Sequence, residues 1–487
     1  MFGGYGLPVT GASPPYLPGI MNDLWVSIAG LNGQPAVWVP ANLPITTTTL
    51  ANGDITSTAN TAPLEAPYAY SSNASTVTYT PTTTPPTPSG ISQMVVYTPG
   101  GPGSRWGSVS WVDGSGNLYV FGGQGYSYPP SSGLLNDLWK FTPGIYDTNS
   151  VTGNYSGSYS YTGNWTFVSG STGANATGSY GTQGSPGGVP GGRWGASYCT
   201  DASGTLWMFG GQGYDSTGNI VLLNDLWKYS GGAWTWVGPS SSNVGQQNGV
   251  YPAALGGTGT PGGRQTALLV PDSAGNLWLF GGLGLDSVGT QNPGSISGLP
   301  AGAAPEGALL NDLWEYNIAA QTWTWVSGGG ATGLANQVGT YGTQQAPAAG
   351  FFPGSRWSQS GWIDSNNSIW VFGGWGYASS LAQSTGFLND VWEYDTAGPN
   401  AGLWTWWKGS SNVNQAGSYP VQFPDPLGLP FVGNTPGGRR GVAFWPQNPF
   451  QPATMTGYVW AFGGQGFDMK GNNGYIDDIW TYLQFPY

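Results

Sequence analysis

The sequence predicts an all-β fold made of six copies of one unit of four antiparallel strands. Two motifs predict the repetition: a Phe-Gly-Gly tripeptide occurs six times in the 487 residues, and Asn-Asp-Leu-Trp or a close variant follows each one. No segment shows the sustained 3.6-residue periodicity of a long helix. The tripeptides begin at Phe2, Phe121, Phe209, Phe280, Phe372 and Phe462.

The unit that begins at Arg105 shows the first two expected strands. An apolar stretch at 107–112 predicts strand one, and Asp-Gly-Ser-Gly-Asn at 113–117 predicts a turn, because these residues tolerate a positive φ. Strand two covers 118–121. We expect it to end at the two glycines of the tripeptide, where a side chain would block the backbone.

Strand three is predicted at the Asn-Asp-Leu-Trp motif, with an aromatic residue such as Tyr229 two positions later. Strand four is predicted where Trp, Thr and Trp alternate with period two, as at Trp234 and Trp236. An Arg opens each new unit, so the units begin at Arg105, Arg193, Arg264, Arg356 and Arg439.

The composition excludes several classes of function. Only 7% of the residues are charged, Asp and Glu outnumber Lys and Arg by 22 to 10, His is absent and Cys occurs once. Without His, neither Ser-His catalysis nor a His-ligated metal is available. The acidic balance argues against nucleic acids and anionic membranes as partners, and no apolar run reaches the roughly 18 residues of a membrane span.

These motifs resemble those of the bacterial kelch-repeat β-propeller family, whose fold galactose oxidase shares. The match is fullest at 191–237, where Gly-Gly-Arg-Trp-Gly, Phe-Gly-Gly, Leu-Asn-Asp-Leu-Trp and Trp-Thr-Trp-Val follow one another. The resemblance implies a kelch-type β-propeller of six blades, each of four antiparallel strands. It implies one propeller made of a partial blade at 1–40 and the repeats of 105–487, with a Thr/Pro-rich insertion or arm at 41–104.

Galactose oxidase binds copper through His and Tyr side chains, and this chemistry cannot be carried over because the chain has no His. Glycosidase chemistry needs paired carboxylates, and no such pair stands out among the Glu residues. We therefore expect no catalytic residues and no cofactor.

The repeated charges are expected to form structural ion pairs, because a partly buried guanidinium needs a carboxylate or carbonyl partner. Each unit offers one repeat Arg and one repeat Asp. The expected pairs are Arg105–Asp137, Arg193–Asp225, Arg264–Asp312, Arg356–Asp390 and Arg439–Asp478.

Three further Asp residues begin Asp-x-x-Gly loops after the tripeptide: Asp215, Asp286 and Asp468. They are weak candidates for Ca²⁺ ligation, because each loop offers one carboxylate and an Asx-turn explains it equally well. We expect no other metal site.

Trp375 is the candidate for an aromatic residue that contacts a ligand. It directly follows Phe-Gly-Gly, where other copies carry Tyr, Gln or Leu, and is expected to begin a loop. Most other Trp residues occupy repeat positions and are interpreted as core packing. Cys199 fills a position that is Trp or Val in the other units, so we expect an inert core thiol.

The segment 41–104 is a spacer, a glycosylated stalk, a subunit-contact arm or simply a long loop. Two runs in it, 76–80 and 94–98, alternate as short strands do. Asn-x-Ser/Thr sequences are candidate glycosylation sites, although Ser/Thr-rich chains produce such matches by chance. They lie at Asn73, Asn154, Asn164, Asn175 and Asn366.

The two ends of the repeat array look incomplete, and 37–39 is a candidate fourth strand for the last blade. Three explanations stay open. The start is internal to a longer gene, and a signal peptide and a strand are missing. Alternatively, the partial blades cooperate in one ring with a strand borrowed from 41–104. In the third explanation a neighbouring subunit completes the open edges in a head-to-tail polymer.

For function, we expect a non-enzymatic, secreted or cell-surface protein. The spacing from Arg to Phe-Gly-Gly is 16 in four units, whereas the spacing from Phe-Gly-Gly to Asn-Asp varies from 15 to 31. Insertions on one face often mark a contact surface, although neutral drift of loops produces the same pattern. One hypothesis is a self-assembling subunit of a surface layer or filament. The other is a monomeric adhesin that binds extracellular protein or glycan through the long-loop face, and a carbohydrate-active enzyme is a remote alternative.

Overall fold

The computed structural model describes most of the chain, and every regular element in the described residues is a β-strand. The described residues therefore form the expected all-β fold. No helix among them is long and apolar enough to cross a membrane. The described residues are 2–6, 19–28, 37–40, 45–49, 55–59, 93–96, 101–127, 131–143, 159–239, 245–290, 307–329, 333–379, 385–418, 434–446 and 458–483.

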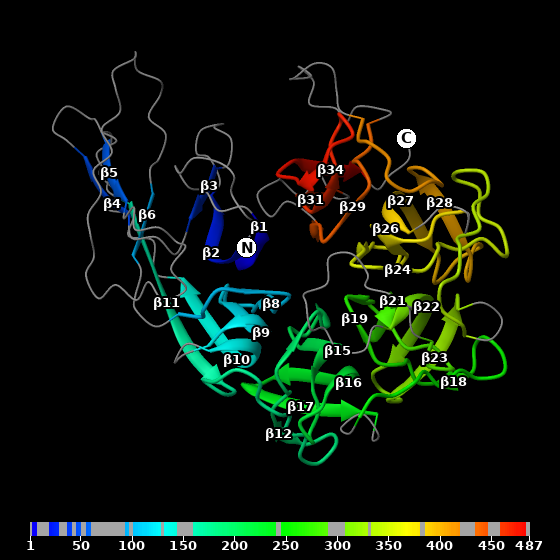
Figure 1. The fold of residues 1–487 in the computed structure, drawn as a ribbon, viewed down its shortest axis with the longest axis horizontal. Coiled ribbons are helices and arrows are strands. Elements are labelled where there is room, and N and C mark those ends of the chain that lie inside the picture. Colours follow the sequence, from blue (N-terminus) through cyan, green and yellow to red (C-terminus); the bar gives the residue numbers. More distant parts are fainter. Residues whose placement is uncertain are drawn as a thin grey trace. The chain divides into compact units, whose positions relative to one another are not determined.

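The chain divides into two compact units: 1–176 with 192–194, and 177–191 with 195–487. The smaller unit holds three separate sheets (Figure 1). Their orders are β1-β2-β3, β4-β5 and β6-β11-β10-β9-β7, and β8 also pairs with β9. The strands are β1 (Phe2–Gly6), β2 (Gly19–Ile28), β3 (Val37–Pro40), β4 (Ile45–Thr49), β5 (Ile55–Ala59), β6 (Gln93–Val96), β7 (Arg105–Trp106), β8 (Val109–Val112), β9 (Leu118–Tyr126), β10 (Ser132–Pro143) and β11 (Tyr159–Ser169).

The prediction that 37–39 forms the fourth strand of the last blade is wrong. These residues lie in β3, which pairs antiparallel with β2 so that Val26 faces Val39 and Ser27 faces Trp38. The strand β2 precedes β3 in the chain and carries the first Asn-Asp-Leu-Trp motif. A hairpin within the first unit therefore forms in place of a long-range pairing. Of the two predicted strands in 41–104, 94–98 overlaps β6, and 76–80 lies outside the described residues.

The larger unit repeats one antiparallel sheet. We name each sheet after the repeat Asp in or beside its third strand. The Asp225 sheet has the order β12-β17-β16-β15, the Asp312 sheet β18-β23-β22-β21-β19 and the Asp390 sheet β24-β26-β27-β28. The Asp478 sheet is split into β29-β32-β33 and β30-β31-β34. Each of the first three sheets carries one further strand, because β14, β20 and β25 pair with β15, β21 and β26 respectively.

The strand bounds show strand one divided in two in each repeat. They are β12 (Pro186–Gly188), β13 (Arg193–Trp194, in the smaller unit), β14 (Ser197–Thr200), β15 (Leu206–Tyr214), β16 (Ile220–Ser230), β17 (Ala233–Gly238), β18 (Thr258–Gly259), β19 (Arg264–Gln265), β20 (Leu268–Pro271), β21 (Asn276–Gly284), β22 (Ala308–Asn317), β23 (Thr322–Ser327), β24 (Arg356–Trp357), β25 (Ser360–Ile363), β26 (Ile369–Gly376), β27 (Gly386–Tyr394), β28 (Trp404–Lys408), β29 (Arg439–Arg440), β30 (Ala443–Pro446), β31 (Tyr458–Phe462), β32 (Gln465–Phe467), β33 (Asn473–Tyr475) and β34 (Ile479–Leu483).

The sequence predicts that the paired glycines end strand two. This is confirmed in the Asp478 sheet, where β31 ends at Phe462, but it is wrong in the Asp225, Asp312 and Asp390 sheets, where strand two continues through the pair. In the Asp225 sheet, β15 continues through Gly210 and Gly211 to Tyr214, and its register with β16 shifts between Phe209 and Gly211. Both glycines have a positive φ, of 64° and 95°. The pair therefore forms a bulge inside a longer strand, a conformation that glycine adopts without steric cost.

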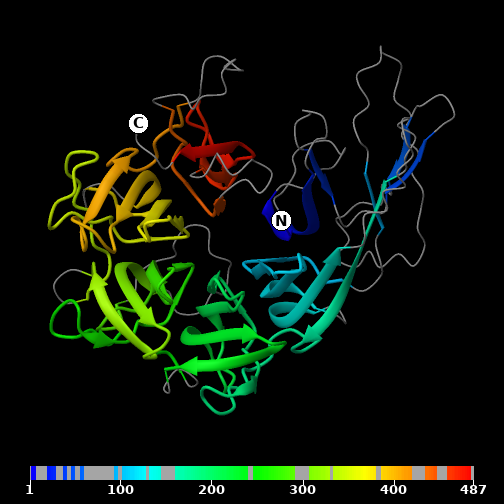
Figure 2. The ribbon, with the colours of Figure 1, turned by 180° about the vertical axis from the view of Figure 1, so that it is seen from behind.

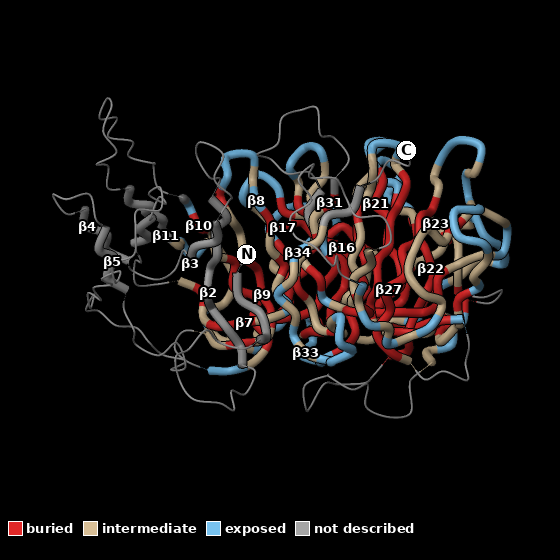
Figure 3. The backbone as a smooth tube through the Cα atoms, turned by 90° about the horizontal axis from the view of Figure 1, so that it is seen from above, coloured by how far each residue is buried: buried red, intermediate tan, exposed pale blue. Residues whose placement is uncertain are grey.

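The core of the larger unit lies between neighbouring sheets, which stand side by side in Figures 1 and 2. Phe209 and Leu226 of the Asp225 sheet pack with Trp314 and Trp325 of the Asp312 sheet. The next interface joins Phe280 to Trp404 in the same way. Buried residues follow β16, β22 and β27, whereas exposed residues concentrate in the connecting loops (Figure 3).

A ladder of backbone hydrogen bonds ties the sheets together at the second residue after each repeat Arg. The Thr266 N–H donates to the Gly195 carbonyl at 2.6 Å, Ser358 to Thr266 at 3.0 Å, and Gly441 to Ser358 at 3.0 Å. Thr266 and Ser358 have φ values of 52° and 53°, which are uncommon for residues other than glycine. The ladder places the first strands of successive sheets next to one another.

Candidate functional site

Four of the expected repeat ion pairs are seen to form, each through two hydrogen bonds. In the Asp312 sheet, the two terminal nitrogens of Arg264 donate to the two carboxylate oxygens of Asp312 at 2.7 and 2.8 Å. The guanidinium also donates to the carbonyls of Gly281 and Gly262. Equivalent two-point contacts are Arg105–Asp137, Arg356–Asp390 and Arg439–Asp478. Arg193 and Asp225 are both buried. In the pairs that form these two-point contacts, the carboxylate is occupied by a structural contact.

A Tyr that the sequence analysis missed completes this arrangement. The Tyr251 hydroxyl donates to Asp312 at 2.5 Å, and its ring packs edge-on against Trp325 at 5.0 Å between centroids. Tyr180 and Tyr341 bind Asp225 and Asp390 in the same way. The sequence signal was a Gly-x-Tyr motif, present at 178–180, 249–251, 339–341 and 417–419.

The three loop Asp residues have donors of their own. Asp215 accepts hydrogen bonds from the Thr217, Asn219 and Gly245 N–H groups at 2.7–2.9 Å. Burial alone would raise the pKa of Asp215, but these bonds lower it below its ordinary value. Asp286 and Asp468 accept similar backbone bonds. Within the described residues no three His, Cys, Asp or Glu side chains gather as a metal site, so the geometry favours Asx-turns.

Asn175 and Asn366 are exposed, whereas the side chain of Asn164 and all of Asn73 and Asn154 lie outside the described residues. Asn175 has a φ of 65°, and its side-chain oxygen accepts from the Leu134 N–H at 2.9 Å. Asn336 and Asn414 repeat this contact with Leu309 and Phe387. Asn175 therefore has a structural role that does not depend on glycosylation.

Cys199 packs against the core cluster of Trp207 and Phe209, as expected for an apolar position. Burial raises the pKa of the thiol, and the charge of Asp201 raises it further. The thiol is therefore not activated as a nucleophile.

Glu393 is a second residue whose setting the sequence did not reveal. It is 9% exposed, and its carboxylate accepts a hydrogen bond from the Trp407 indole at 2.5 Å. Burial raises the pKa of Glu393 to about 7, and the charge of Asp395 adds to this effect. Asp395 in turn accepts from the Ser368 hydroxyl. Glu393 and Asp395 lie two residues apart in the chain, near enough for the charge of Asp395 to raise the pKa of Glu393.

We expect the Glu393→Gln variant to remove a pH dependence of stability. Between pH 4.5 and about 7 the folded protein holds a proton on Glu393 that the unfolded chain releases. The free energy of unfolding therefore falls as pH rises through this window. At pH 8 the variant should be more stable than the wild type by on the order of 2 kcal/mol, with no difference at pH 4. Urea unfolding between pH 4 and 8 measures both.

Glu315→Gln is the matched control for this experiment, because Glu315 occupies the same repeat position in the Asp312 sheet. Burial raises the pKa of Glu315, with a contribution from Asp272, but no indole bond accompanies it among the contacts described. A pH profile of Glu393→Gln that parallels the wild type would contradict the assignment.

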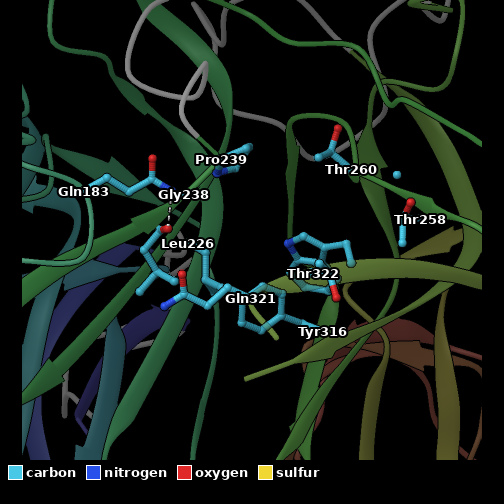
Figure 4. A pocket seen from close by; sticks show the side chains of 12 residues that line it. Gln183, Leu226, Gly238, Pro239, Thr258, Thr260, Tyr316, Gln321 and Thr322 are labelled. Atoms are coloured by element: carbon cyan, nitrogen blue, oxygen red, sulfur yellow. Dashed lines mark hydrogen bonds between the residues drawn. The ribbon is translucent and has the colours of Figure 1, made fainter. Parts of the chain in front are cut away.

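A small cavity of about 160 Å³ lies between the Asp225 and Asp312 sheets. Leu226, Gly238 and Tyr316 line it, and Gln183 at its side donates to the Val237 carbonyl at 2.8 Å (Figure 4). Its lining includes no charged side chain. The volume suits a few water molecules rather than a sugar-sized ligand.

The prediction that Trp375 begins a loop is wrong. Trp375 lies within β26, opposite Trp357. It is half-buried and packs edge-on against Phe387, with ring centroids 4.7 Å apart. Its ring also borders the buried cluster of Leu283, Leu309 and Trp357. Trp375 therefore packs against the core on one side. It also contacts the side chain of Arg440.

Arg440 extends over these aromatic rings. The carbon of its guanidinium lies 4.7 Å from the Trp357 ring centroid and 5.9 Å from that of Trp375. Its Nε and Nη2 donate to the side-chain oxygen of Gln465 at 3.1 and 2.7 Å. Its Nη1 is buried and has no hydrogen-bond partner among the described residues. Burial lowers the pKa of Arg440, because removing the charged guanidinium from water is energetically unfavourable.

Arg440 belongs to a row of side chains at one repeat position, directly after the repeat Arg. We call Gln265, Trp357 and Arg440 the first-strand row. Each member has a buried polar atom without a partner among the described residues: Oε1 of Gln265, Nε1 of Trp357 and Nη1 of Arg440. Gln265 and Trp357 are 1% and 4% exposed. The same position in the smaller unit holds Trp106 and Trp194, whose rings lie 4.6 Å apart. The row is the candidate site.

No protein-family model matches the sequence, and no curated protein does. The solved structures that are similar to it include the following two. YjhT is 15% identical, with 80% of this chain and 86% of that chain aligned at a TM-score of 0.41. A fungal alcohol oxidase of the AA5 family, in complex with copper, is 12% identical, with 93% of this chain and 71% of that chain aligned at a TM-score of 0.34. The repeated sheets described above are themselves consistent with a β-propeller of kelch type.

Proposed function

We propose that the protein is a kelch-type propeller of six blades that acts outside the cell as a non-enzymatic binding module for a small polar ligand such as a sugar. The motif count supports six blades, and the low charge suits a secreted or surface setting. Parts of the long-loop face, for example 291–306 and 419–433, lie outside the described residues. We place the proposed site at the first-strand row, because its members carry buried polar atoms that have no partner among the described residues.

One observation carries this proposal: in three successive repeats, a buried polar atom at the same position has no hydrogen-bond partner among the described residues. An unsatisfied buried donor or acceptor costs about 1–3 kcal/mol, and a bound ligand that supplies the partners recovers this energy. Ligand sites combine aromatic walls with a few polar groups in this way. Trp357 and Trp375 provide the walls, and Gln265, Trp357 and Arg440 provide the polar groups.

Tryptophan fluorescence titration tests the proposal. The probes are glucose, galactose, N-acetylglucosamine, glucuronate and galacturonate. We expect saturable quenching by at least one of them, with a dissociation constant below about 1 mM. Trp357→Phe keeps the ring but removes the indole donor, and should weaken binding about tenfold. Trp278→Phe is the control, because its indole already donates to Asp272 outside the row. No saturable change, or unaltered binding by Trp357→Phe, would overturn the proposal.

A specific observation favours self-assembly as a second candidate function. Ile479 in β34 is 50% exposed, whereas the equivalent residues of the other sheets are at most 5% exposed. Those equivalents are Leu138, Leu226, Leu313 and Val391. In the other sheets a fourth strand covers this position, and β34 has no outer partner among the described strands. A strand from a second copy would cover it, and negative-stain imaging of the purified protein would show filaments or single particles.

A further inference from the structure

The six Arg residues have unlike surroundings, and the difference indicates a ligand class. Arg264, Arg356 and Arg439 each meet a carboxylate through two hydrogen bonds and also donate to backbone carbonyls. Arg440 follows Arg439 directly in the chain, yet among the described residues its side chain donates hydrogen bonds only to the neutral side chain of Gln465. Among the described residues its charge is therefore not neutralised.

The orientation of Arg440 is set on two sides. Gln465 occupies the Nε–Nη2 edge of the guanidinium, and Trp357, Trp375 and Phe387 lie within 4.7–6.0 Å of its central carbon. A planar guanidinium held against aromatic rings keeps its remaining edge in a fixed direction. That remaining edge carries Nη1, which has no hydrogen-bond partner among the described residues.

We propose that Arg440 selects a ligand that carries a carboxylate, with Nη1 as the donor that the carboxylate accepts from. The inference rests on the proposed function and narrows its ligand class. An anion suits this position because a half-buried cation without a counter-charge is costly, whereas a charge-assisted hydrogen bond is about twice as strong as a neutral one. The Trp357 ring, whose centroid lies 4.7 Å from the guanidinium carbon, carries an indole N–H that has no partner among the described residues, and this N–H is the second donor of the site.

The test compares acid and neutral forms of one sugar on the full chain. Calorimetric titration uses glucuronate, glucose and acetate as probes. We expect glucuronate to bind the wild type at least tenfold more tightly than glucose, and more weakly as sodium chloride rises. Arg440→Gln should abolish this preference, and Arg440→Lys should keep part of it. Because Arg440→Gln removes an unpaired cation, its melting temperature should not fall.

Lys228→Met is the matched control, since Lys228 is also a cation near a Trp ring, 5.9 Å from Trp207, but lies outside the row. It should leave the preference unchanged. Equal binding of glucose and glucuronate would overturn the inference and leave the proposed function standing. Absence of binding by every probe would overturn both. If acetate bound as tightly as glucuronate, the carboxylate alone would be recognised. This result would support the role of Arg440 and would show that binding does not require a sugar ring.

Discussion

Replacing Asp312 by Ala should destabilise the larger unit by about 3–5 kcal/mol, the cost typical of breaking a buried ion pair from one side. Asp312 and Arg264 are both 0% exposed. The carboxylate accepts two bonds from Arg264, one from the Tyr251 hydroxyl and one from the Trp314 indole. The variant leaves a buried charge and two buried donors without their acceptor. Urea unfolding followed by tryptophan fluorescence measures the loss.

Asp272→Ala is the matched control for Asp312→Ala, because it makes the same substitution in the same sheet. Asp272 also accepts four hydrogen bonds, but its partners lie in or next to its own turn and carry no charge. We expect a cost of about 1–2 kcal/mol. Equal losses in the two variants would show that hydrogen-bond number, and not the buried charge, determines the effect.

A double variant separates the charge from the hydrogen bonds. Arg264→Met combined with Asp312→Leu removes both charges, so its cost should be smaller than the sum of the two single changes. The wild type should also lose stability as pH falls below the ordinary Asp value of 3.8. Burial opposes ionisation of Asp312, but the Arg264 charge lowers its pKa in the folded state. Protonation therefore favours the unfolded chain, and the double variant should lack this part of the acid sensitivity.

The Arg–Asp contacts could be predicted from the sequence because the chain has so few charges. Each unit has one repeat Arg and one repeat Asp. A buried guanidinium needs an acceptor, so the sequence predicted that the two residues pair. The third partner could not be inferred in the same way. Tyr251 lies 61 residues before Asp312, and only the path of the loop along the outer strand brings its hydroxyl to the carboxylate.

The candidate site was harder to predict for a different reason. Repeat analysis finds positions that stay the same, whereas the first-strand row is a position that changes, from Gln265 to Trp357 to Arg440. Arg440 directly follows the repeat Arg439 and does not itself belong to the repeat pattern, and Trp375 was expected to begin a loop. Strand pairing of Trp357 with Trp375 and of Arg440 with Gln465 brings these side chains together. Those pairings depend on where β24 and β29 begin, which the motifs did not show.

The Gly210→Ala variant should lose more than about 3 kcal/mol of stability, because two separate effects oppose a side chain at this position. Its φ of 64° is unfavourable for Ala by roughly 1–2 kcal/mol. In addition, a Cβ there would lie 2.5 Å from the Arg264 carbonyl oxygen and 2.6 Å from that of Leu223. Arg264 begins the next sheet and Leu223 belongs to the partner strand, so neither backbone can retreat without opening a sheet interface.

Gly204→Ala separates these two costs, since Gly204 has a φ of 81° but nothing within 4 Å of the added Cβ. Gly204→Ala should lose only the stability that corresponds to the cost of a positive φ for Ala. Urea unfolding of both variants gives the difference, which is the energy of close approach between the Asp225 and Asp312 sheets. If Gly210→Ala lost no more than Gly204→Ala, the paired glycines would be required only for the strand bulge. A larger loss would mean that they also set the spacing between neighbouring sheets, and through it the spacing of Gln265, Trp357 and Arg440 along the first-strand row.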